Sequence, residues 1–237
     1  MKKILKILLK ITAGTILLML IAFAVIYAVY NKPLPSGNEG RAADELAEKL
    51  LKSINFEAYQ NTRFLEWSFA SGSHHYIWDK ANGKVQVEWA TYKVNLNLVN
   101  GAQSEVFQNN ERVTGSDRLQ RIKTATDYFN NDSFWLVAPF KVFDKGTKRS
   151  LVTKDDGSEA LLVTYTDGGT TPGDSYLWNL DTSGFPLSYQ MWVQIIPIGG
   201  IEASWDGWQV MESGVFLPTT HKLGPITLNM GEIRGYN

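Results

Sequence analysis

The chain has no cysteine among its 237 residues. This absence excludes disulfides, thiol nucleophiles and cysteine-bound metals, and also the lipidated cysteine that anchors a bacterial lipoprotein. If the chain is exported, its folded part must therefore be stabilised without cross-links, by the burial of apolar side chains.

Histidine is scarce as well, and the three histidines form no cluster with the spacing of metal ligands. His74 and His75 are adjacent in a predicted strand, so they point to opposite faces and cannot share one ion. We expect His221, in a late strand, to be partly exposed. Asp167 and Asp174 flank a glycine-rich segment that we interpret as a loop rather than a calcium site. The sequence predicts no metal and no cofactor.

Motifs of common enzyme classes are also missing. The chain contains no Gly-x-Ser-x-Gly elbow, no Walker loop and no Rossmann glycine fingerprint. Carboxylates on strands, such as Glu66 and Asp206, are the one arrangement that remains for hydrolysis, because their separation in space is invisible in a sequence. We predict that the protein is not an enzyme.

Positive charge is in short supply outside the N-terminus. Without its first four lysines the chain has 19 Lys and Arg against 24 Asp and Glu, a net charge of about −5. Nucleic-acid binding requires a basic surface. We therefore predict no nucleic-acid partner.

A long uncharged run is present at the N-terminus, in residues 11–30. A helix of about 20 apolar residues crosses the hydrocarbon core of a bilayer. Four lysines precede the run and the single Lys32 follows it, which places the N-terminus in the cytoplasm. Residues 1–30 are thus predicted to be a single-pass anchor in the cytoplasmic membrane, with the rest of the chain outside, in the periplasm.

A cleaved signal peptide is the alternative, since Ala22-Phe23-Ala24 has the small-x-small form of a cleavage site. However, the apolar run continues beyond this site to Tyr30. Cleavage would leave an apolar N-terminus in water, so we favour the uncleaved anchor.

Beyond the span, the sequence predicts a linker and one β-rich domain. Residues 31–40 are rich in proline, glycine and polar residues, as in a short stalk. Residues 41–54 have apolar residues at helical spacing, which predicts an amphipathic helix. From residue 62 the period changes to two, and four strands follow with an Asn82-Gly83 hairpin turn among them.

A second helix is predicted from Ser116 to the sequence Asn130-Asn131-Asp132, followed by an aromatic segment that Pro139 keeps irregular. Strands then resume, with joints such as Gly168-Gly169. About ten or eleven antiparallel strands rarely stay flat. We therefore predict a mainly β (α+β) fold in residues 41–237, a large curled antiparallel sheet that forms a half-open barrel with two covering helices.

Aromatic residues share one face of the predicted strands, where they either fill a core or enclose an apolar cavity. The residues that we expect to line such a cavity are Trp67, Phe69, Tyr76, Trp78 and Trp89, with Phe134 and Trp135 in a lid. A later strand aligns Tyr189, Met191, Val193 and Ile195 in the same way. Trp192 and Trp208 fall on the opposite, more polar face, which makes them candidates for a contact surface.

The order of these elements resembles that of lipoprotein-sorting and lipoglycan-carrier proteins of the LolA, LolB and LppX type. FLEWSFASGSHHYIWDK is similar to the early strands of that family, and NNDSFWLVAPFKVFDKG to the middle of lipoprotein-like envelope domains. The likeness covers about residues 42–232. It implies a half-open barrel that holds acyl chains under a helical lid. Because those carriers are soluble or lipidated, a spanning anchor favours a stationary holder.

Two functions are therefore expected. The first is a membrane-anchored envelope protein that holds a lipid or lipoprotein acyl chain without catalysis. The alternative is a membrane-tethered module with a filled core, which binds another envelope protein through Trp192 and Trp208. An open cavity favours the first function, and a packed interior with both tryptophans exposed favours the second.

The predicted topology is tested by protease treatment and extraction. Protease added to spheroplasts is expected to degrade the domain, because it lies outside the membrane. Alkaline carbonate is expected to leave the chain in the membrane pellet, because a spanning helix is held by its apolar surface. Both results are read on immunoblots. Recovery of a shortened, soluble form would show instead that the N-terminus is a cleaved signal peptide.

Overall fold

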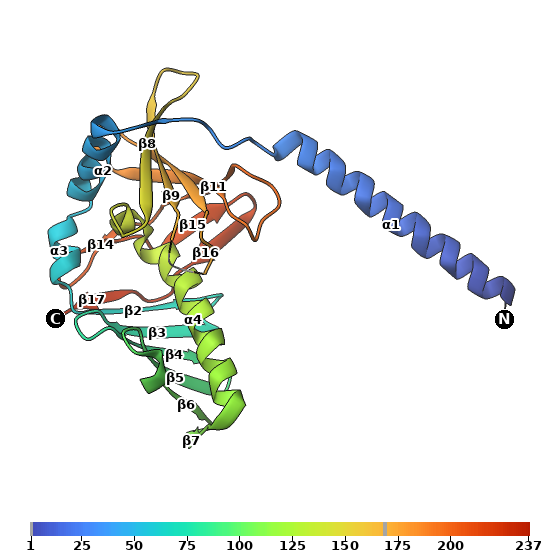
Figure 1. The fold of residues 1–237 in the computed structure, drawn as a ribbon, viewed down its shortest axis with the longest axis horizontal. Helices are drawn as coiled ribbons and strands as arrows, with labels where there is room; N and C mark the ends of the chain where they lie inside the picture. The colour runs from blue at the N-terminus through green and yellow to red at the C-terminus, as the bar shows by residue number, and fades with distance from the viewer. Residues whose placement is uncertain (1, 168–169) are drawn as a thin grey trace.

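The computed structural model describes residues 2–167 and 170–237, in which two large antiparallel sheets follow a long N-terminal helix (Figure 1). The helix, α1 (Lys2–Tyr30), stands apart from the sheets. Among the described residues it is the one helix long and apolar enough to cross a membrane, and none of its apolar window is buried. These properties fit a membrane anchor or a signal sequence. Gly168 and Gly169, a predicted joint, lie outside the described residues.

Seven strands form the first sheet, here called sheet I, in the order β17-β2-β3-β4-β5-β6-β7. Its strands are β2 (Phe64–Phe69), β3 (His74–Asp79), β4 (Lys84–Trp89), β5 (Tyr92–Asn97), β6 (Glu105–Gln108), β7 (Glu111–Arg112) and β17 (Arg234–Tyr236). The four strands predicted from residue 62 onward are present. In β2, Leu65, Trp67 and Phe69 are buried, while the residues between them are partly exposed, because successive side chains alternate between faces.

Eight strands form the second sheet, here called sheet II, in the order β1-β8-β9-β10-β11-β12-β15-β16. They are β1 (Asn38–Glu39), β8 (Thr147–Thr153), β9 (Glu159–Tyr165), β10 (Ser175–Leu180), β11 (Pro186–Trp192), β12 (Ile201–Ser204), β15 (Thr220–Leu223) and β16 (Ile226–Asn229). A short hairpin of β13 (Gln209–Val210) and β14 (Phe216–Leu217) lies outside both sheets.

The prediction of one continuous sheet is wrong, and the described strands form no closed barrel. The division follows from a helix: α4 (Gly115–Val137) separates the strands of sheet I from those of sheet II along the chain. Two short strands depart from this division: β1 precedes sheet I in the chain but pairs with β8 of sheet II, and β17 pairs with β2, so that the C-terminus completes sheet I. The coarser prediction, an α+β fold with large antiparallel sheets, is confirmed.

Helices cover the sheets where the sequence predicts them, with two differences. The amphipathic helix α2 (Arg41–Ser53) buries its apolar side and contacts sheet II, where Arg149 Nε donates to Asp44 Oδ1 at 2.6 Å. A short α3 (Phe56–Asn61) and two 3-10 turns, η1 (Gly101–Gln103) and η2 (Ala138–Lys141), were not predicted. The second predicted helix does not end at residues 130–132 but continues to Val137.

The extension of α4 is due to tertiary contacts. Asn and Asp favour helix ends because their side chains compete for backbone groups. Here the carboxylate of Asp132 is instead bound by side chains of sheet I, and Leu136 and Val137 are fully or almost fully buried. Packing therefore overrides the weak helical preference of residues 130–132.

The main core is continuous between the two sheets. The cluster of buried residues contains side chains of both sheets, of α2 and of α4. Phe129 of α4 lies against Trp78 of sheet I, with ring centroids 5.2 Å apart, and Phe134 lies against Tyr176 of sheet II at 4.7 Å. One hydrophobic core thus joins the sheets through α4, which runs from one to the other in Figure 1.

The predicted stalk is not a free linker, because it lies on sheet II. Asn38 and Glu39 form β1, which pairs with Leu151 and Ser150 at the edge of the sheet. A Cβ atom on Gly37 would come within 2.9 Å of the Leu151 oxygen, so the close approach depends on glycine.

His221 differs from its predicted, partly exposed state, because its side chain is 0% exposed. The ring lies against Trp135 and Trp205, with centroids 5.3 Å and 4.6 Å away. Its Nδ1 lies 2.9 Å from the Ser204 carbonyl oxygen, to which we assign a donated hydrogen bond. Burial lowers the pKa of His221 to about 4, so the ring is neutral at pH 7.

The burial of His221 predicts a pH dependence of stability. The pKa of His221 is about 4 in the folded chain and lies below the ordinary value of 6.5, so the unfolded chain binds the proton more tightly. The free energy of unfolding is therefore at its full value above pH 6.5 and decreases as the pH falls toward 4. Between pH 7 and 4.5 the loss from this group is roughly 2 to 3 kcal/mol. Urea unfolding of the full chain in mild detergent, followed by tryptophan fluorescence, measures it.

The matched variant is His221→Gln, which does not titrate in this range. It is expected to be less stable at pH 7 but to lose less stability on acidification than the natural chain. Equal losses in the two chains would contradict the assignment.

Candidate functional site

A cavity of about 620 Å³ lies between the C-terminal half of α4 and the facing side of sheet II. Ligand pockets typically have volumes of about 300–1,000 Å³. The apolar wall is formed by Phe129, Phe134, Trp135, Val137, Tyr165, Tyr176, Tyr189, Met191, Val193, Ile195 and Ile196, and Trp78 and Leu98 extend it toward sheet I.

One side of the wall comes from a single strand and the segment that continues it. Tyr189 and Met191 are alternate residues of β11, and Val193 and Ile195 continue the alternation beyond its end. All four line the cavity: Tyr189 and Met191 share a face of the strand, and the turn closed by the Ile196 N–H and the Val193 oxygen at 3.1 Å carries Ile195 to the same wall. These are the four residues that the sequence predicts to share one face of a later strand.

Aromatic rings form most of the remaining wall. Phe134 packs against Tyr165 at 5.4 Å, and Tyr176 packs against Tyr189 at 5.1 Å. Burial raises the pKa values of the three tyrosines well above the ordinary value of 10, so their hydroxyls stay neutral. Among the described residues, the hydroxyl of Tyr165 has no hydrogen-bond partner.

The rim of the cavity is polar and is tied together by hydrogen bonds. Asn130 Nδ2 of α4 donates to Thr170 Oγ1 at 2.9 Å, which connects the helix to the loop between β9 and β10. Asp174 Oδ1 accepts from the Gln194 backbone N–H at 2.9 Å, which connects that loop to the segment after β11. Lys141 and Asp144, which also line the cavity, form an ion pair. The site therefore combines an apolar wall with a charged and amide-rich rim.

A buried carboxylate holds α4 on sheet I beside this cavity. Asp132 is 2% exposed, and its Oδ2 accepts from Tyr76 Oη at 2.5 Å and lies 2.7 Å from His74 Nδ1. Asn131 Nδ2 donates to the other oxygen at 2.8 Å. Burial, followed by the charge of Asp132, raises the pKa of Tyr76, so the phenol remains a donor. Tyr128 stacks on His74 at 4.1 Å.

This cluster was missed by the sequence reading because its members are far apart in the chain and the histidine was weighed only as a metal ligand. Within the described residues, no group of three or more His, Cys, Asp or Glu is placed to hold a metal ion. The contacts of Asp132 with His74 and Tyr76 connect α4 to β3. They make the cluster a structural connection.

Three of the seven residues predicted to line a cavity do so: Trp78, Phe134 and Trp135. Phe134 and Trp135 belong to α4 rather than to a separate lid. The other four, Trp67, Phe69, Tyr76 and Trp89, are not part of this wall.

Those four residues lie under another part of α4. Trp67 stacks on Tyr76 at 4.5 Å and packs against Phe129 at 6.3 Å. Trp89 meets Tyr128 edge to face at 5.6 Å, and Phe69 is buried in the same core. Their face of sheet I is filled by helix side chains, and the cavity is instead on sheet II.

Trp192 and Trp208 are half-buried rather than free on the surface. Trp192 Nε1 donates to the backbone oxygen of Lys32 at 2.8 Å. Trp208 Nε1 donates to the backbone oxygen of Trp205 at 2.9 Å, and its ring lies 4.9 Å from Phe185. Both indoles therefore already have partners within the chain. Each is only partly exposed, so neither is the free surface anchor that the expected interaction module would present.

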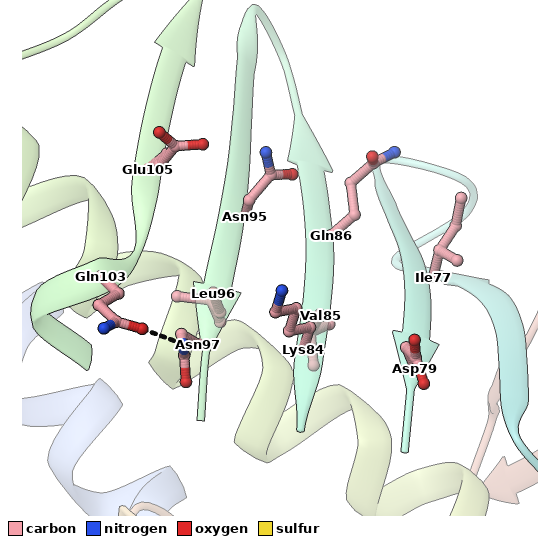
Figure 2. Close-up of a pocket in the computed structure, with 10 residues that line it drawn as sticks. All are labelled: Ile77, Asp79, Lys84, Val85, Gln86, Asn95, Leu96, Asn97, Gln103 and Glu105. Carbon is pink, nitrogen blue, oxygen red and sulfur yellow. Dashed lines mark hydrogen bonds between the residues drawn. The ribbon is translucent and has the colours of Figure 1, made fainter. Parts of the chain in front are cut away.

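A second, shallower hollow of about 390 Å³ lies on the outer face of sheet I (Figure 2). Its polar side chains include Asp79, Lys84, Gln86, Asn95, Asn97, Gln103 and Glu105. Figure 2 shows most of them on strands in front of the helix, with Gln103 on the turn η1, and Asn97 Nδ2 donates to Gln103 Oε1 at 3.0 Å. Ile77, which lies on the outward face of β3, is a large apolar side chain that lines the hollow. The hollow offers little apolar contact to a ligand.

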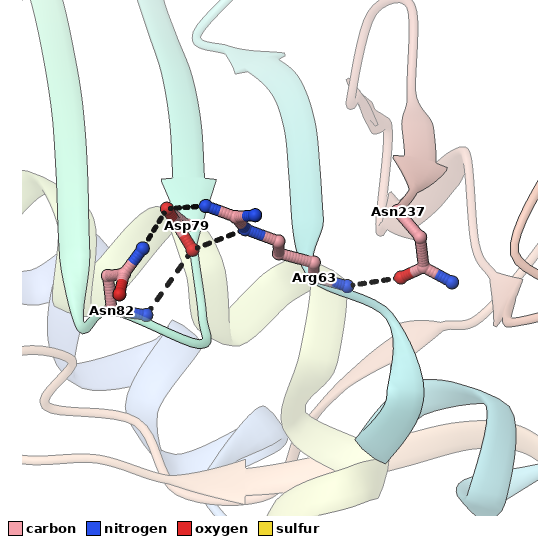
Figure 3. A network of polar contacts seen from close by, with 4 residues as sticks. All are labelled: Arg63, Asp79, Asn82 and Asn237. Carbon is pink, nitrogen blue, oxygen red and sulfur yellow. Dashed lines mark hydrogen bonds and ion pairs between the residues drawn. The ribbon is translucent and has the colours of Figure 1, made fainter.

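A polar network beside this hollow fixes the C-terminus (Figure 3). Arg63 forms two hydrogen bonds with Asp79, of 3.3 and 3.2 Å, and Asn82 Nδ2 donates to the same carboxylate at 2.7 Å. The Arg63 side chain holds the pKa of Asp79 below its usual range. The Arg63 backbone N–H donates to Asn237 Oδ1 at 2.8 Å. The network connects the β3–β4 turn to the last residue.

No family model matches the chain, and no curated protein matches it.

The role of Asp132 predicts a large effect on stability. Asp132→Ala leaves the Tyr76 hydroxyl and His74 without their acceptor in a buried position. We expect the free energy of unfolding to fall by about 2 to 3 kcal/mol, measured by urea unfolding of the full chain in mild detergent. Asp127→Ala is the control, because its pair with Lys123 is on the helix surface and is worth only about 0.5 kcal/mol. Equal effects of the two changes would contradict this role.

Proposed function

We propose that this protein is a membrane-anchored, non-catalytic holder of an amphiphile, whose acyl chain occupies the cavity between α4 and sheet II. The observation that carries the proposal is the combination of a cavity of about 620 Å³ with an apolar wall and a polar rim. The acyl chain of an amphiphile would contact the apolar wall, and its polar head would contact the polar rim. In this proposal, sheet II and α4 together act as a half-open barrel for the chain.

Apolar contact would supply most of the binding energy. Burial of apolar surface contributes about 25 cal/mol per Å². Phe134, Tyr176 and Tyr189 are rings packed against one another, so few side-chain rotations are lost when a ligand enters. A site that is largely formed beforehand favours binding for the same reason.

The hydroxyl of Tyr165 supports a ligand that also carries an oxygen atom. A buried donor without a partner costs about 1 to 3 kcal/mol. Tyr165 lines the cavity, and its hydroxyl has no partner within the described residues. The hydroxyl oxygen has almost no surface open to the cavity, so a small shift of the ring would let a carbonyl or ester oxygen of the ligand accept this hydrogen bond and offset the cost.

The anchor belongs to the same proposal. We infer that α1 remains attached and spans the cytoplasmic membrane, with the domain on its outer face. A holder fixed at the membrane would keep its ligand, a lipid or a lipoprotein acyl chain, at the place where it is received.

The proposal is tested by photocrosslinking in intact membranes. A diazirine fatty acid is supplied to cells, activated by light, and located by mass spectrometry of peptides from the full chain. Crosslinks are expected on β10, on β11 and in α4 near Phe134. Crosslinks to α1, which would face lipid, give an internal reference for probe uptake.

Val193→Phe is the test variant, because the larger side chain occupies part of the cavity. We expect cavity crosslinks to fall by about tenfold, which corresponds to about 1.4 kcal/mol of binding energy. Val210→Phe adds the same group at a position that is 64% exposed, on β13, and is expected to have no effect. If the natural chain is labelled on α1 but not in the cavity, the proposed function is wrong.

A further inference from the structure

The end of α1 is bonded directly to one loop of the domain. This loop, residues 193–200, connects β11 to β12. The Asn31 backbone N–H donates to Tyr27 O at 2.9 Å, as in a last helical turn, and Asn31 Oδ1 accepts from the Gly199 N–H at 2.8 Å. The Lys32 N–H donates to Gly199 O at 2.9 Å. The helix ends at Tyr30, and only Asn31 lies between it and Lys32, which forms the second hydrogen bond to the loop.

Close packing reinforces these bonds. Trp192 Nε1 donates to Lys32 O, so the indole holds the segment that leaves α1. A Cβ atom on Gly199 would lie 2.5 Å from Trp192 Cδ1 and 2.9 Å from Lys32 O. Only glycine at this position allows the contact. The loop and the end of α1 thus form one unit, and they lie side by side in Figure 1.

The composition of the loop fits a membrane surface. Residues 193–200 read VQIIPIGG and contain no charged side chain. Ile195 is 70% exposed, a large apolar side chain in contact with water. Apolar side chains of peripheral segments lie about 5–10 Å deep, at the boundary of headgroups and acyl chains. Tyr30, at the end of the apolar run, belongs at that same headgroup level.

The loop is also part of the cavity wall, which it lines with Val193, Ile195 and Ile196. The wall therefore continues from the rings on β10 and β11 to the place where the chain leaves α1. A ligand that enters along Ile195 would pass from one apolar environment to another. Its acyl chain would avoid most of the exposure to water that entry from solution requires.

We propose that the loop of residues 193–200 inserts into the outer leaflet beside the anchor, and that the cavity takes its acyl chain directly from that leaflet. The ligand part of this inference rests on the proposed function, whereas the membrane contact rests on the loop and α1. The ligand class is then a lipid or acylated molecule resident in the bilayer, rather than one delivered through water.

The absence of cysteine allows a direct test, because a single introduced cysteine is labelled uniquely. Ile195→Cys carries an environment-sensitive NBD fluorophore in the full chain, reconstituted in phosphatidylcholine–phosphatidylglycerol vesicles with or without lipids that bear a quenching nitroxide near the headgroup. Val210→Cys is the control. It is similarly exposed, and its partner strand β14 lies on the side of the domain away from α1.

Position 195 is expected to emit at shorter wavelength than position 210, and nitroxide lipid is expected to quench it at least twofold more strongly. Gly199→Ala, added to Ile195→Cys, should reduce this difference, because the added methyl group displaces Lys32 from the loop. Gly101→Ala should leave it unchanged, since a Cβ atom there meets nothing within 4 Å.

Equal quenching at positions 195 and 210 would overturn the inference. If the fatty-acid probe still crosslinks to the cavity in that case, the proposed function stands and only the membrane route fails. If position 195 is quenched and no crosslink reaches the cavity, the loop contacts the membrane while the ligand-holding function and the uptake of its ligand from the leaflet are wrong.

Discussion

The burial of α4 against two different sheets is the interaction on which the other features of this fold depend. The helix places Phe129 against Trp67 and Trp78 of sheet I. One and a half turns later, it places Phe134 and Trp135 against tyrosines of sheet II. Asp132 lies between these groups and closes the helix onto sheet I by hydrogen bonds. Without α4 the large apolar faces of both sheets would be open to water, which explains why its weak helix formers are nevertheless helical.

The cavity follows from this arrangement. Where α4 crosses sheet I, side chains of the helix fill the space above the strands, and Trp67 and Tyr76 become core residues. Farther along, the helix side chains and the tyrosines of sheet II enclose a space of about 620 Å³. The same sheet receives the segment that leaves α1, through β1 and through Trp192. The proposed ligand site and the proposed anchor are thus attached to the same sheet.

Much of the local structure was predictable from the sequence, because its signals are short-range. The alternation of Leu65, Trp67 and Phe69 predicted a strand, and Asn82-Gly83 predicted the turn between β3 and β4. The helical spacing of residues 41–54 predicted α2. Each of these features depends on neighbours in the chain, and a period of two or 3.6 reports them directly.

The arrangement of these elements was not predictable in the same way. The alternation along their strands indicated that Trp67 and Tyr189 both face an interior. It could not indicate that Trp67 faces a filled core and Tyr189 a cavity. The contacts of Asp132 with Tyr76, and of Gly199 with Lys32, join residues that are 56 and more than 100 positions apart. His221 was misjudged for a similar reason, because its burial depends on Trp135 and Trp205. Such contacts are set by tertiary packing, which leaves no periodic signal.

The most direct test of the ligand-holding account is an experimental structure of the full chain, purified from its own membranes under conditions that retain bound lipid. The account predicts continuous, elongated density between Phe134, Tyr176 and Met191, with its polar end toward the rim at Asn130 and Thr170. A cavity that is filled by the chain's own side chains, or that contains only ordered water, would contradict it.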